Sequence, residues 1–207
     1  MAPREVLISK ALSYLLRHGA VKEKLPIDSR GYVELTTILN HPRIKTHRAT
    51  VEEVEKVVAE NDKKRFTIET RADGNQYICA NQGHSLDSVT EENLQPLPYG
   101  DMPDNVYHGT FANKLEAINS SGGLLRMKRN HIHFTSDAEW SQSGIRKTCT
   151  VLIYLDLDKC KEQGLEFFRS ANGVILTRGD ERGMVPASCF REIKHLAQVT
   201  KKPKSQD

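Results

Sequence analysis

The chain has 207 residues, a formal net charge of +3 and 38% hydrophobic residues. This composition is sufficient for a packed core and excludes a globally disordered chain. The four cysteines form no CxxC pair, which argues against structural zinc and indicates a reduced protein of the cytoplasm or nucleus. No apolar run reaches membrane-spanning length and the N-terminus lacks a signal-peptide core, so we expect no membrane partner.

The first predicted element is an amphipathic helix. Ile8, Leu12 and the leucines that follow keep helical spacing, and Gly19 is a natural stop just beyond them. This spacing predicts that Arg17 and His18 lie at the C-terminal end of the helix. Two readings stay open for them: a functional site, or stabilisation of the helix dipole by cations.

Two further helices and a β-hairpin are predicted next. Residues 33–39 indicate a short helix, and Thr50 with Glu53 forms the capping box of another. Apolar and polar residues then alternate across 66–79 around an Asp-Gly turn, which predicts a hairpin. Three short helices followed by a hairpin is the order of a winged-helix module, which we assign to residues 1–95.

A proline-rich stretch divides the chain. We predict a linker at residues 96–105, a β-rich lobe at residues 106–198 and a polar tail at residues 199–207. In this second lobe a short helix is expected to stop at Gly122 and the glycine after it. The predicted strands are "VYHGT", "HIHFT", "CTVLIYLDL", "GLEFFRS" and "GVILTRG".

The stretch "RNHIHFT" carries two histidines at strand spacing. In a strand His131, His133 and Thr135 share one face, while the apolar residues between them point into a core. A histidine pair needs further ligands to bind zinc, and only His84 and His108 lie near enough in sequence. No carboxylate pattern accompanies them, so we predict no metal site; hydrogen-bonded structural histidines remain an alternative.

Arginines recur beside histidines or at strand starts. Arg17, Arg65, Arg129 and Arg146 each offer a planar, permanently charged fork that matches phosphate oxygens. The loop "ANQGHS" adds amide and hydroxyl groups that suit either a polar ligand or a simple turn. No GxGxxG, P-loop lysine or GxSxG motif is present, so a Rossmann, P-loop or serine-hydrolase site is unsupported. Cys149 opens an apolar strand, and we expect it to be buried rather than nucleophilic.

Eight stretches, taken in order, resemble the RNA 2′-phosphotransferase family. They are "SKALSYLLRHG", "DSRGYV", "NDKKRF", "ANQGHS", "YHGT", "RNHIHFT", "SGIR" and "FFRSANGVILT", and they span residues 8–195. Each motif alone is weak, but eight in the same order are specific. The resemblance implies an α+β fold in which a winged-helix lobe is followed by an ADP-ribosyltransferase-like lobe that binds NAD.

The resemblance also implies the reaction. The family removes an internal 2′-phosphate from spliced RNA, typically tRNA, with NAD as co-substrate and no metal. Nicotinamide leaves first, giving a 2′-phospho-ADP-ribosyl RNA; 2′-OH RNA and ADP-ribose 1″,2″-cyclic phosphate follow. A monomer is expected. The alternatives are ADP-ribosylation of terminal phosphates of RNA or DNA without the second step, a non-enzymatic winged-helix nucleic-acid-binding protein, and a zinc protein.

Residue roles follow from the family motifs. The resemblance assigns catalysis to Arg17, His18, Arg65, Arg129 and Arg146, with the roles of the last two open between phosphate and NAD. It assigns NAD binding to His108, Gly109, Thr110, His131, His133, Thr135, Arg146 and Asn172. Binding of the RNA substrate is assigned to Arg17, His18, Arg65, Asn81, Gln82 and His84. Val174 stands where many protein-modifying ADP-ribosyltransferases carry a glutamate, which favours a phosphate nucleophile.

Overall fold

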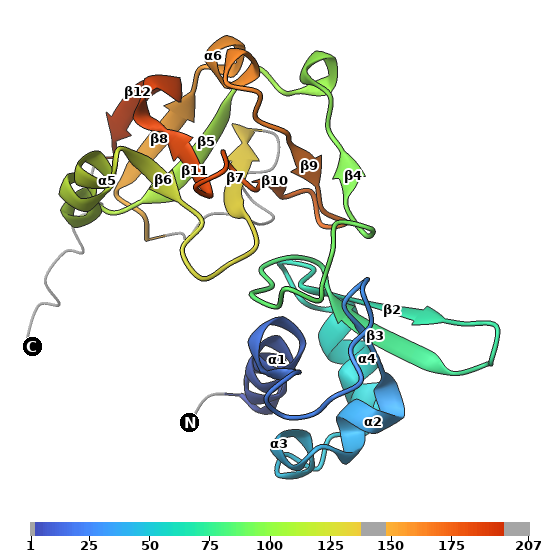
Figure 1. Cartoon of the computed structure of the whole chain (residues 1–207). Helices are drawn as coiled ribbons and strands as arrows, with labels where there is room; N and C mark the ends of the chain where they lie inside the picture. Colours follow the sequence, from blue (N-terminus) through green and yellow to red (C-terminus); the bar gives the residue numbers. More distant parts are fainter. Residues whose placement is uncertain (1–2, 138–147, 197–207) are drawn as a thin grey trace, which may run out of the picture.

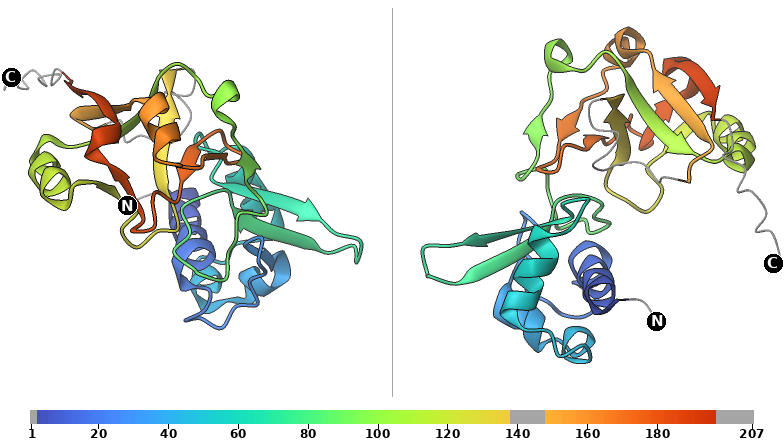
Figure 2. Two further views of the ribbon diagram at one scale, coloured as in Figure 1. Left: turned by 45° about the horizontal axis from the view of Figure 1, so that its top comes forward. Right: turned by 180° about the vertical axis from the view of Figure 1, so that it is seen from behind.

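The chain folds into two lobes, each with its own hydrophobic core. The computed structural model describes residues 3–137 and 148–196. One core draws its buried side chains from Ile8 to Val89, and the larger of the remaining clusters draws its own from Leu97 to Cys189. Figure 1 shows the N-terminal lobe below the C-terminal lobe, and both views of Figure 2 keep the lobes adjacent. The expected α+β class is confirmed.

The N-terminal lobe packs helices against a small antiparallel sheet. Its helices are α1 (Arg4–Tyr14), the π-helical turn η1 (Leu15–Gly19), α2 (Leu35–Asn40), α3 (Pro42–Lys45) and α4 (Val51–Ala59). Its strands are β1 (Tyr32–Glu34), β2 (Phe66–Thr70) and β3 (Gln76–Ala80), in the order β1-β3-β2. The short second helix predicted from residue 33 begins only after β1, because Val33 pairs with Ile78 in this sheet.

The end of α1 departs from a simple helix stop. Gly19 was expected just beyond the helix, but it is the last residue of the π-helical turn. A Cβ at Gly19 would lie 2.6 Å from the Tyr14 ring, so only glycine fits beneath that ring. A π-helical turn widens the helix locally, and this one carries Arg17 and His18 toward the C-terminal lobe.

The predicted capping box and hairpin are both confirmed. The Thr50 hydroxyl accepts from the Glu53 backbone N–H, and the Glu53 carboxylate accepts from the Thr50 N–H. This arrangement satisfies two otherwise unpaired donors at the start of α4. β2 and β3 pair antiparallel with Ile68 opposite Ile78, and Gly74 turns the hairpin with φ of +80°.

The C-terminal lobe is built around a seven-stranded sheet. Neighbouring strands of the sheet pair antiparallel, in the order β12-β8-β5-β7-β10-β9-β4. Its strands are β4 (Gln95–Pro96), β5 (Val106–Thr110), β7 (Ile132–Ser136), β8 (Val151–Leu155), β9 (Phe168–Arg169), β10 (Ile175–Thr177) and β12 (Phe190–His195). β6 (Gly123–Leu125) and β11 (Met184–Pro186) form a separate pair. The remaining helical elements are η2 (Tyr99–Asp101), η3 (Ala112–Lys114), α5 (Leu115–Ser121), α6 (Leu157–Glu162) and η5 (Ala187–Cys189).

Strand β7 lies near the middle of this sheet and carries His133, while His131 immediately precedes its first residue. Phe134 and Ile132 pack into the core, as the alternation predicts. His131 and His133 are also buried, at 8% exposure each, although their face was expected to be a polar row. The N-terminal lobe covers that face, since a residue of loop 82–91 hydrogen-bonds each imidazole.

Two other expectations need adjustment, and one is confirmed. The predicted strand "GLEFFRS" shortens to β9, two residues long. The proline-rich stretch begins inside the sheet, because Pro96 belongs to β4 and pairs with Phe168. α5 does end at Gly122, whose φ of +84° is the left-handed conformation that suits a helix end.

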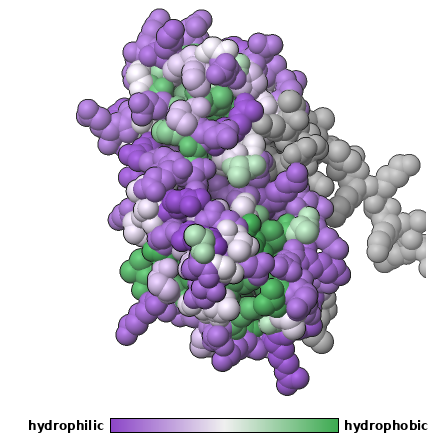
Figure 3. Space-filling view, turned by 90° about the vertical axis from the view of Figure 1, so that its right-hand side faces the viewer, coloured by the Kyte–Doolittle hydropathy of each residue, from purple (hydrophilic) through white to green (hydrophobic). Residues whose placement is uncertain are grey.

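The outer surface is mostly polar. Figure 3 shows one side of the molecule, on which hydrophilic residues predominate and hydrophobic residues gather in small patches. All four cysteines are buried, including Cys149 as expected. None of the helices in the described parts of the chain is long and apolar enough to span a membrane.

Candidate active site between the lobes

Arg17 is the centre of the predicted site, and its guanidinium is held in the protein interior. The Nε and Nη2 atoms are buried and have no hydrogen-bond partner among the described residues. Loop 81–85 packs against the same side chain: Gly83 has φ of +88°, and a Cβ there would lie 3.5 Å from Arg17 Cδ. Leaving two buried donors unsatisfied is costly for a folded protein. Such a group is therefore preorganised for an acceptor outside the described residues.

Two more predicted arginines act on Arg17 through space. Burial first, then the charges of Arg129 and Arg65, lower the pKa of Arg17 to about 10. Arg65 comes from the turn before β2 and donates to Asn61 Oδ1 at 2.9 Å. Arg129 comes from the loop before β7. The structure thus brings three of the four predicted arginines together, while Arg146 lies outside the described residues. Their mutual repulsion is relieved when a multiply charged anion binds.

His18 stands beside this cationic cluster. Its Nδ1 lies 2.9 Å from Ser85 Oγ, and the Ser85 backbone N–H donates to the Arg17 carbonyl at 2.9 Å. Burial and then the charges of Arg17 and Arg129 lower the pKa of His18. The imidazole is therefore neutral at physiological pH and would gain basicity once an anion offsets the arginines.

His84 is the other unsatisfied side chain. Its Nε2 atom is buried without a hydrogen-bond partner in the described residues. Burial, followed by the charges of Arg17, His131 and His18, lowers the pKa of His84 to about 4. A cavity of about 20 Å³, enough for one water molecule, is lined by His84, Gln82 and residues of both lobes.

Three histidines of the C-terminal lobe are held in defined tautomers. His131 Nε2 lies 2.8 Å from Glu91 Oε1, His133 Nε2 lies 2.8 Å from Gln82 Oε1, and His108 Nδ1 lies 2.8 Å from the His133 carbonyl. Each partner is an acceptor, so each named nitrogen carries the proton and the other ring nitrogen accepts. Burial, the largest cause in each case, lowers the pKa of all three.

The remaining predicted residues line or support the same region. Gly109 and Thr110 lie on β5 opposite Leu152 and Val151 of β8, and Thr135 is fully buried on β7. Asn81 fastens the loop, because its amide donates to the Lys64 carbonyl at 2.7 Å. Asn172 joins the lobes by donating to the Lys63 carbonyl at 2.9 Å. For Asn81 and Asn172 the structure therefore shows protein contacts.

Sequence reasoning did not single out several residues that join the lobes. Glu91 ion-pairs with Arg178 and accepts a hydrogen bond from His131, and Asn130 donates its amide to the carbonyls of Leu86 and Val89. Glu91 and Arg178 are 87 residues apart in sequence, and no local pattern links them. In residues 3–137 and 148–196 no group of three or more His, Cys, Asp and Glu side chains is placed to hold a metal ion.

Cations from both lobes, Arg17 and Arg65 from one and Arg129 from the other, lie beside histidines of the C-terminal lobe whose pKa values are lowered, an arrangement typical of proteins that bind a polyanion between two lobes. Comparison with known families agrees. The model of the "RNA 2′-phosphotransferase, Tpt1/KptA family" matches residues 3–179. The chain belongs to this family.

Named relatives match over most of their length. The tRNA 2′-phosphotransferase of Saccharomyces cerevisiae is 44% identical over 184 residues, covering 84% of this chain and 79% of the relative. The tRNA 2′-phosphotransferase 1 of Danio rerio is 38% identical, with coverage of 93% and 87%. That of Mus musculus is 41% identical, with coverage of 98% and 81%.

Proposed function

We propose that the protein is an NAD-dependent tRNA 2′-phosphotransferase, which removes the internal 2′-phosphate left in spliced tRNA. The observation that carries the proposal is Arg17, whose two buried donors lack a partner among the described residues and whose neighbours include two further arginines. A phosphate dianion supplies acceptor oxygens and negative charge together. The relatives named above act on tRNA according to their names, which supports tRNA as the substrate.

The N-terminal lobe is proposed to be a winged-helix module that presents the phosphate clamp. Arg17 and Arg65 of this lobe, together with Arg129 of the C-terminal lobe, bind the 2′-phosphate, and loop 81–85 holds Arg17 in place through Gly83 and Ser85. A phosphate that is already anionic needs no general base to become a nucleophile. Positioning and charge stabilisation are therefore the main contributions of the clamp to the first step.

The C-terminal lobe is proposed to be ADP-ribosyltransferase-like and to hold NAD. His108 Nε2 and His133 Nδ1 are left as acceptors by the hydrogen bonds of their other nitrogens. An unprotonated imidazole nitrogen can accept a hydrogen bond from a ribose hydroxyl. Val174 is buried at 1% exposure in the turn before β10, and its N–H donates to Ser170 Oγ. This position therefore offers no carboxylate to activate a protein nucleophile.

NAD, when bound, supplies the ribose carbon that accepts the phosphate and the hydroxyl that later closes the cyclic phosphate. In the first step a phosphate oxygen would form a bond to that carbon, and the nicotinamide nitrogen would leave with the bonding pair. In the second step the ribose hydroxyl oxygen would form a bond to phosphorus and lose its proton, while the RNA 2′ oxygen would leave phosphorus and take up a proton. The arginines stabilise charge on the phosphoryl oxygens, and His18 is the proton carrier that we assign to this step.

Two alternatives predict different products. ADP-ribosylation of terminal phosphates needs the first step alone and would leave ADP-ribosylated nucleic acid. A non-enzymatic binding module would bind RNA without consuming NAD. The paired arrangement of cations and neutral histidines across the lobes favours the two-step enzyme, because binding alone requires no set of fixed tautomers in the second lobe.

The test uses a short RNA with one internal 2′-phosphate, incubated with and without NAD and without added metal. The expected products are 2′-OH RNA, nicotinamide and ADP-ribose cyclic phosphate. Arg17→Ala is expected to reduce turnover by about 10²-fold or more, since it removes a charge-stabilising donor. Arg30→Ala, which removes an arginine that pairs with Glu69, is the matched control and should retain turnover. Normal turnover by both Arg17→Ala and Arg65→Ala would refute the phosphate clamp.

A further inference from the structure

Positive charge is unevenly distributed outside the site. Segments 20–24 and 41–48 contain five lysines and arginines and a single carboxylate, that of Glu23, a net charge of +4. The whole chain has a net charge of +3, so all of its other residues together sum to −1. These two segments are therefore among the most positively charged stretches of the chain.

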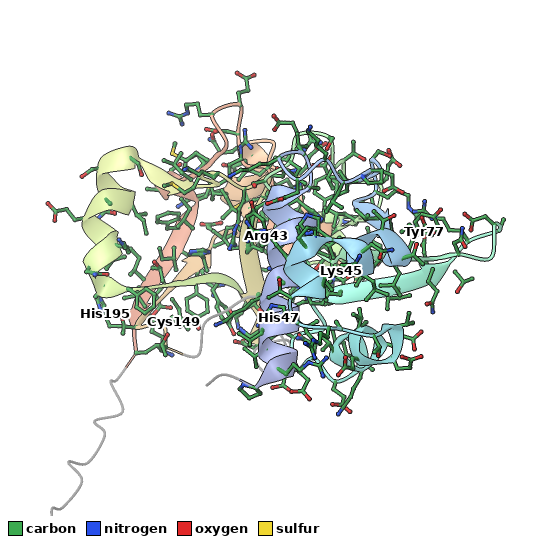
Figure 4. All side chains as sticks on the ribbon, turned by 90° about the horizontal axis from the view of Figure 1, so that it is seen from below. Arg43, Lys45, His47, Tyr77, Cys149 and His195 are labelled. Carbon is green, nitrogen blue, oxygen red and sulfur yellow. The ribbon has the colours of Figure 1, made fainter. Side chains whose placement is uncertain are left out.

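The two segments form one surface. Glu23 accepts from Arg43 Nε at 3.1 Å and lies 3.4 Å from His41 Nε2, which fastens the loop after η1 to α3. The Arg43 guanidinium also lies 4.4 Å from the centre of the Tyr14 ring. Figure 4 views the molecule from below, and the labelled Arg43, Lys45 and His47 lie on that face of the N-terminal lobe. We call this surface the basic strip; it comprises Lys22, Lys24, Arg43, Lys45 and Arg48.

Most of the strip is uncompensated. Lys22, Lys24, Lys45 and Arg48 are exposed, and none forms an ion pair with a carboxylate of the described residues. The single acid of the strip, Glu23, is already engaged by Arg43. Four exposed cations on one surface attract a partner that carries several negative charges.

The strip is adjacent to the phosphate clamp along the chain. Tyr14 is the residue immediately before the turn that carries Arg17 and His18, and loop 20–24 follows that turn directly. At a rise of about 1.5 Å per residue, Tyr14 and His18 are separated by roughly 6 Å along the helix. A chain whose phosphate is held by Arg17 can therefore pass around the end of α1 and onto the strip.

Helix α4 offers the opposite charge. It precedes the β2–β3 hairpin, and in a helix-turn-helix module the second helix enters a nucleic-acid groove. Here Glu52, Glu55 and Glu60 are exposed on or next to this helix, with Lys56 as the one exposed cation of residues 51–60. Their carboxylates would repel phosphates, so this face is unsuited to the usual mode of groove binding.

We propose that the basic strip binds the sugar–phosphate backbone of the substrate RNA outside the reactive nucleotide. The inference rests on the proposed function, because it takes RNA as the polyanion. Lysines bind phosphates as point charges and carry no sequence information. The strip would therefore increase affinity for a long RNA without contributing to the reaction on a short one.

The test compares the wild-type protein with the variant Lys22→Glu/Lys24→Glu/Lys45→Glu. The matched control, Lys114→Glu/Lys161→Glu/Lys194→Glu, reverses three exposed lysines of the C-terminal lobe that lack ion pairs in the described chain. Steady-state kinetics are measured on a folded tRNA and on a trinucleotide, each bearing one internal 2′-phosphate. Fluorescence anisotropy gives the affinity for the same tRNA without NAD, at several salt concentrations.

The strip variant is expected to raise KM for the tRNA by at least about tenfold at low salt and to leave the trinucleotide unaffected. The slope of log affinity against log salt should fall by about 2 to 3 for three lost phosphate contacts. Unchanged tRNA affinity, an equal loss on both substrates, or an equal loss in the control would overturn the proposal. If the wild type proves inactive on both substrates the proposed function fails, while the anisotropy measurements still decide whether the strip binds RNA.

Discussion

Replacing Arg17 by methionine should stabilise the fold while abolishing the response to phosphate. Two donors of the charged guanidinium are buried without partners among the described residues, and burial with two neighbouring arginines lowers the pKa of Arg17 from 12.5 to about 10. At about 1.36 kcal/mol per unit, this shift corresponds to roughly 3 kcal/mol of penalty on the charged form. The penalty is fully present at neutral pH, where Arg17 is protonated in both the folded and the unfolded chain.

Methionine fills much of the same volume without the charge, so we expect the variant to gain about 1–2 kcal/mol after imperfect packing is allowed for. Urea unfolding at pH 7.5 measures this change. Arg30→Met is the matched control. Arg30 pairs with Glu69, so this variant should be less stable than the wild type.

The second readout is thermal melting with inorganic phosphate. Phosphate binds only the folded state of the wild type and should raise its melting temperature, by linkage. The Arg17→Met protein should show little or no shift. A variant that is destabilised by 2 kcal/mol or more, yet still stabilised by phosphate, would refute the argument that Arg17 is a strained, preorganised anion ligand.

Three further outcomes follow from the site. Gly83→Ala should destabilise the protein by about 1 kcal/mol or more, since alanine is strained at a φ of +88°. Relief of that strain would shift the loop that packs against Arg17 and weaken phosphate binding, so unaltered phosphate binding would contradict this. Gln82→Ala should lower kcat more than tenfold with little change in RNA affinity, because His133 loses the acceptor that sets its tautomer; Gln82→Glu, which keeps an acceptor, should retain more activity. The pKa of His84 is lowered to about 4, so below pH 6.5 the unfolded state binds a proton that the folded state does not. The free energy of unfolding should therefore fall by roughly 3 kcal/mol as pH drops from 6.5 to 4. Urea titrations of His84→Gln should show a smaller loss.

Local patterns in the sequence were sufficient to locate most helices and strands. Helical spacing located α1 and alternation located β7 and the β2–β3 hairpin, because these signals depend on neighbours within a few residues. The family motifs indicated Arg17, Arg65 and Arg129 from the sequence alone. The strand pairing of Val33 and the two-residue length of β9 were missed, because both are decided by partners distant in sequence.

Tertiary structure alone decided how the site works. The sequence contained the histidines of β7, but only the packed lobes show that Gln82 and Glu91 select the tautomers of His133 and His131. It contained Arg17, but only the fold leaves two of its donors buried without partners in the described chain. Residue identities and hydrophobic periodicity can be read from the sequence, whereas desolvation and charge coupling depend on distances that exist only after folding.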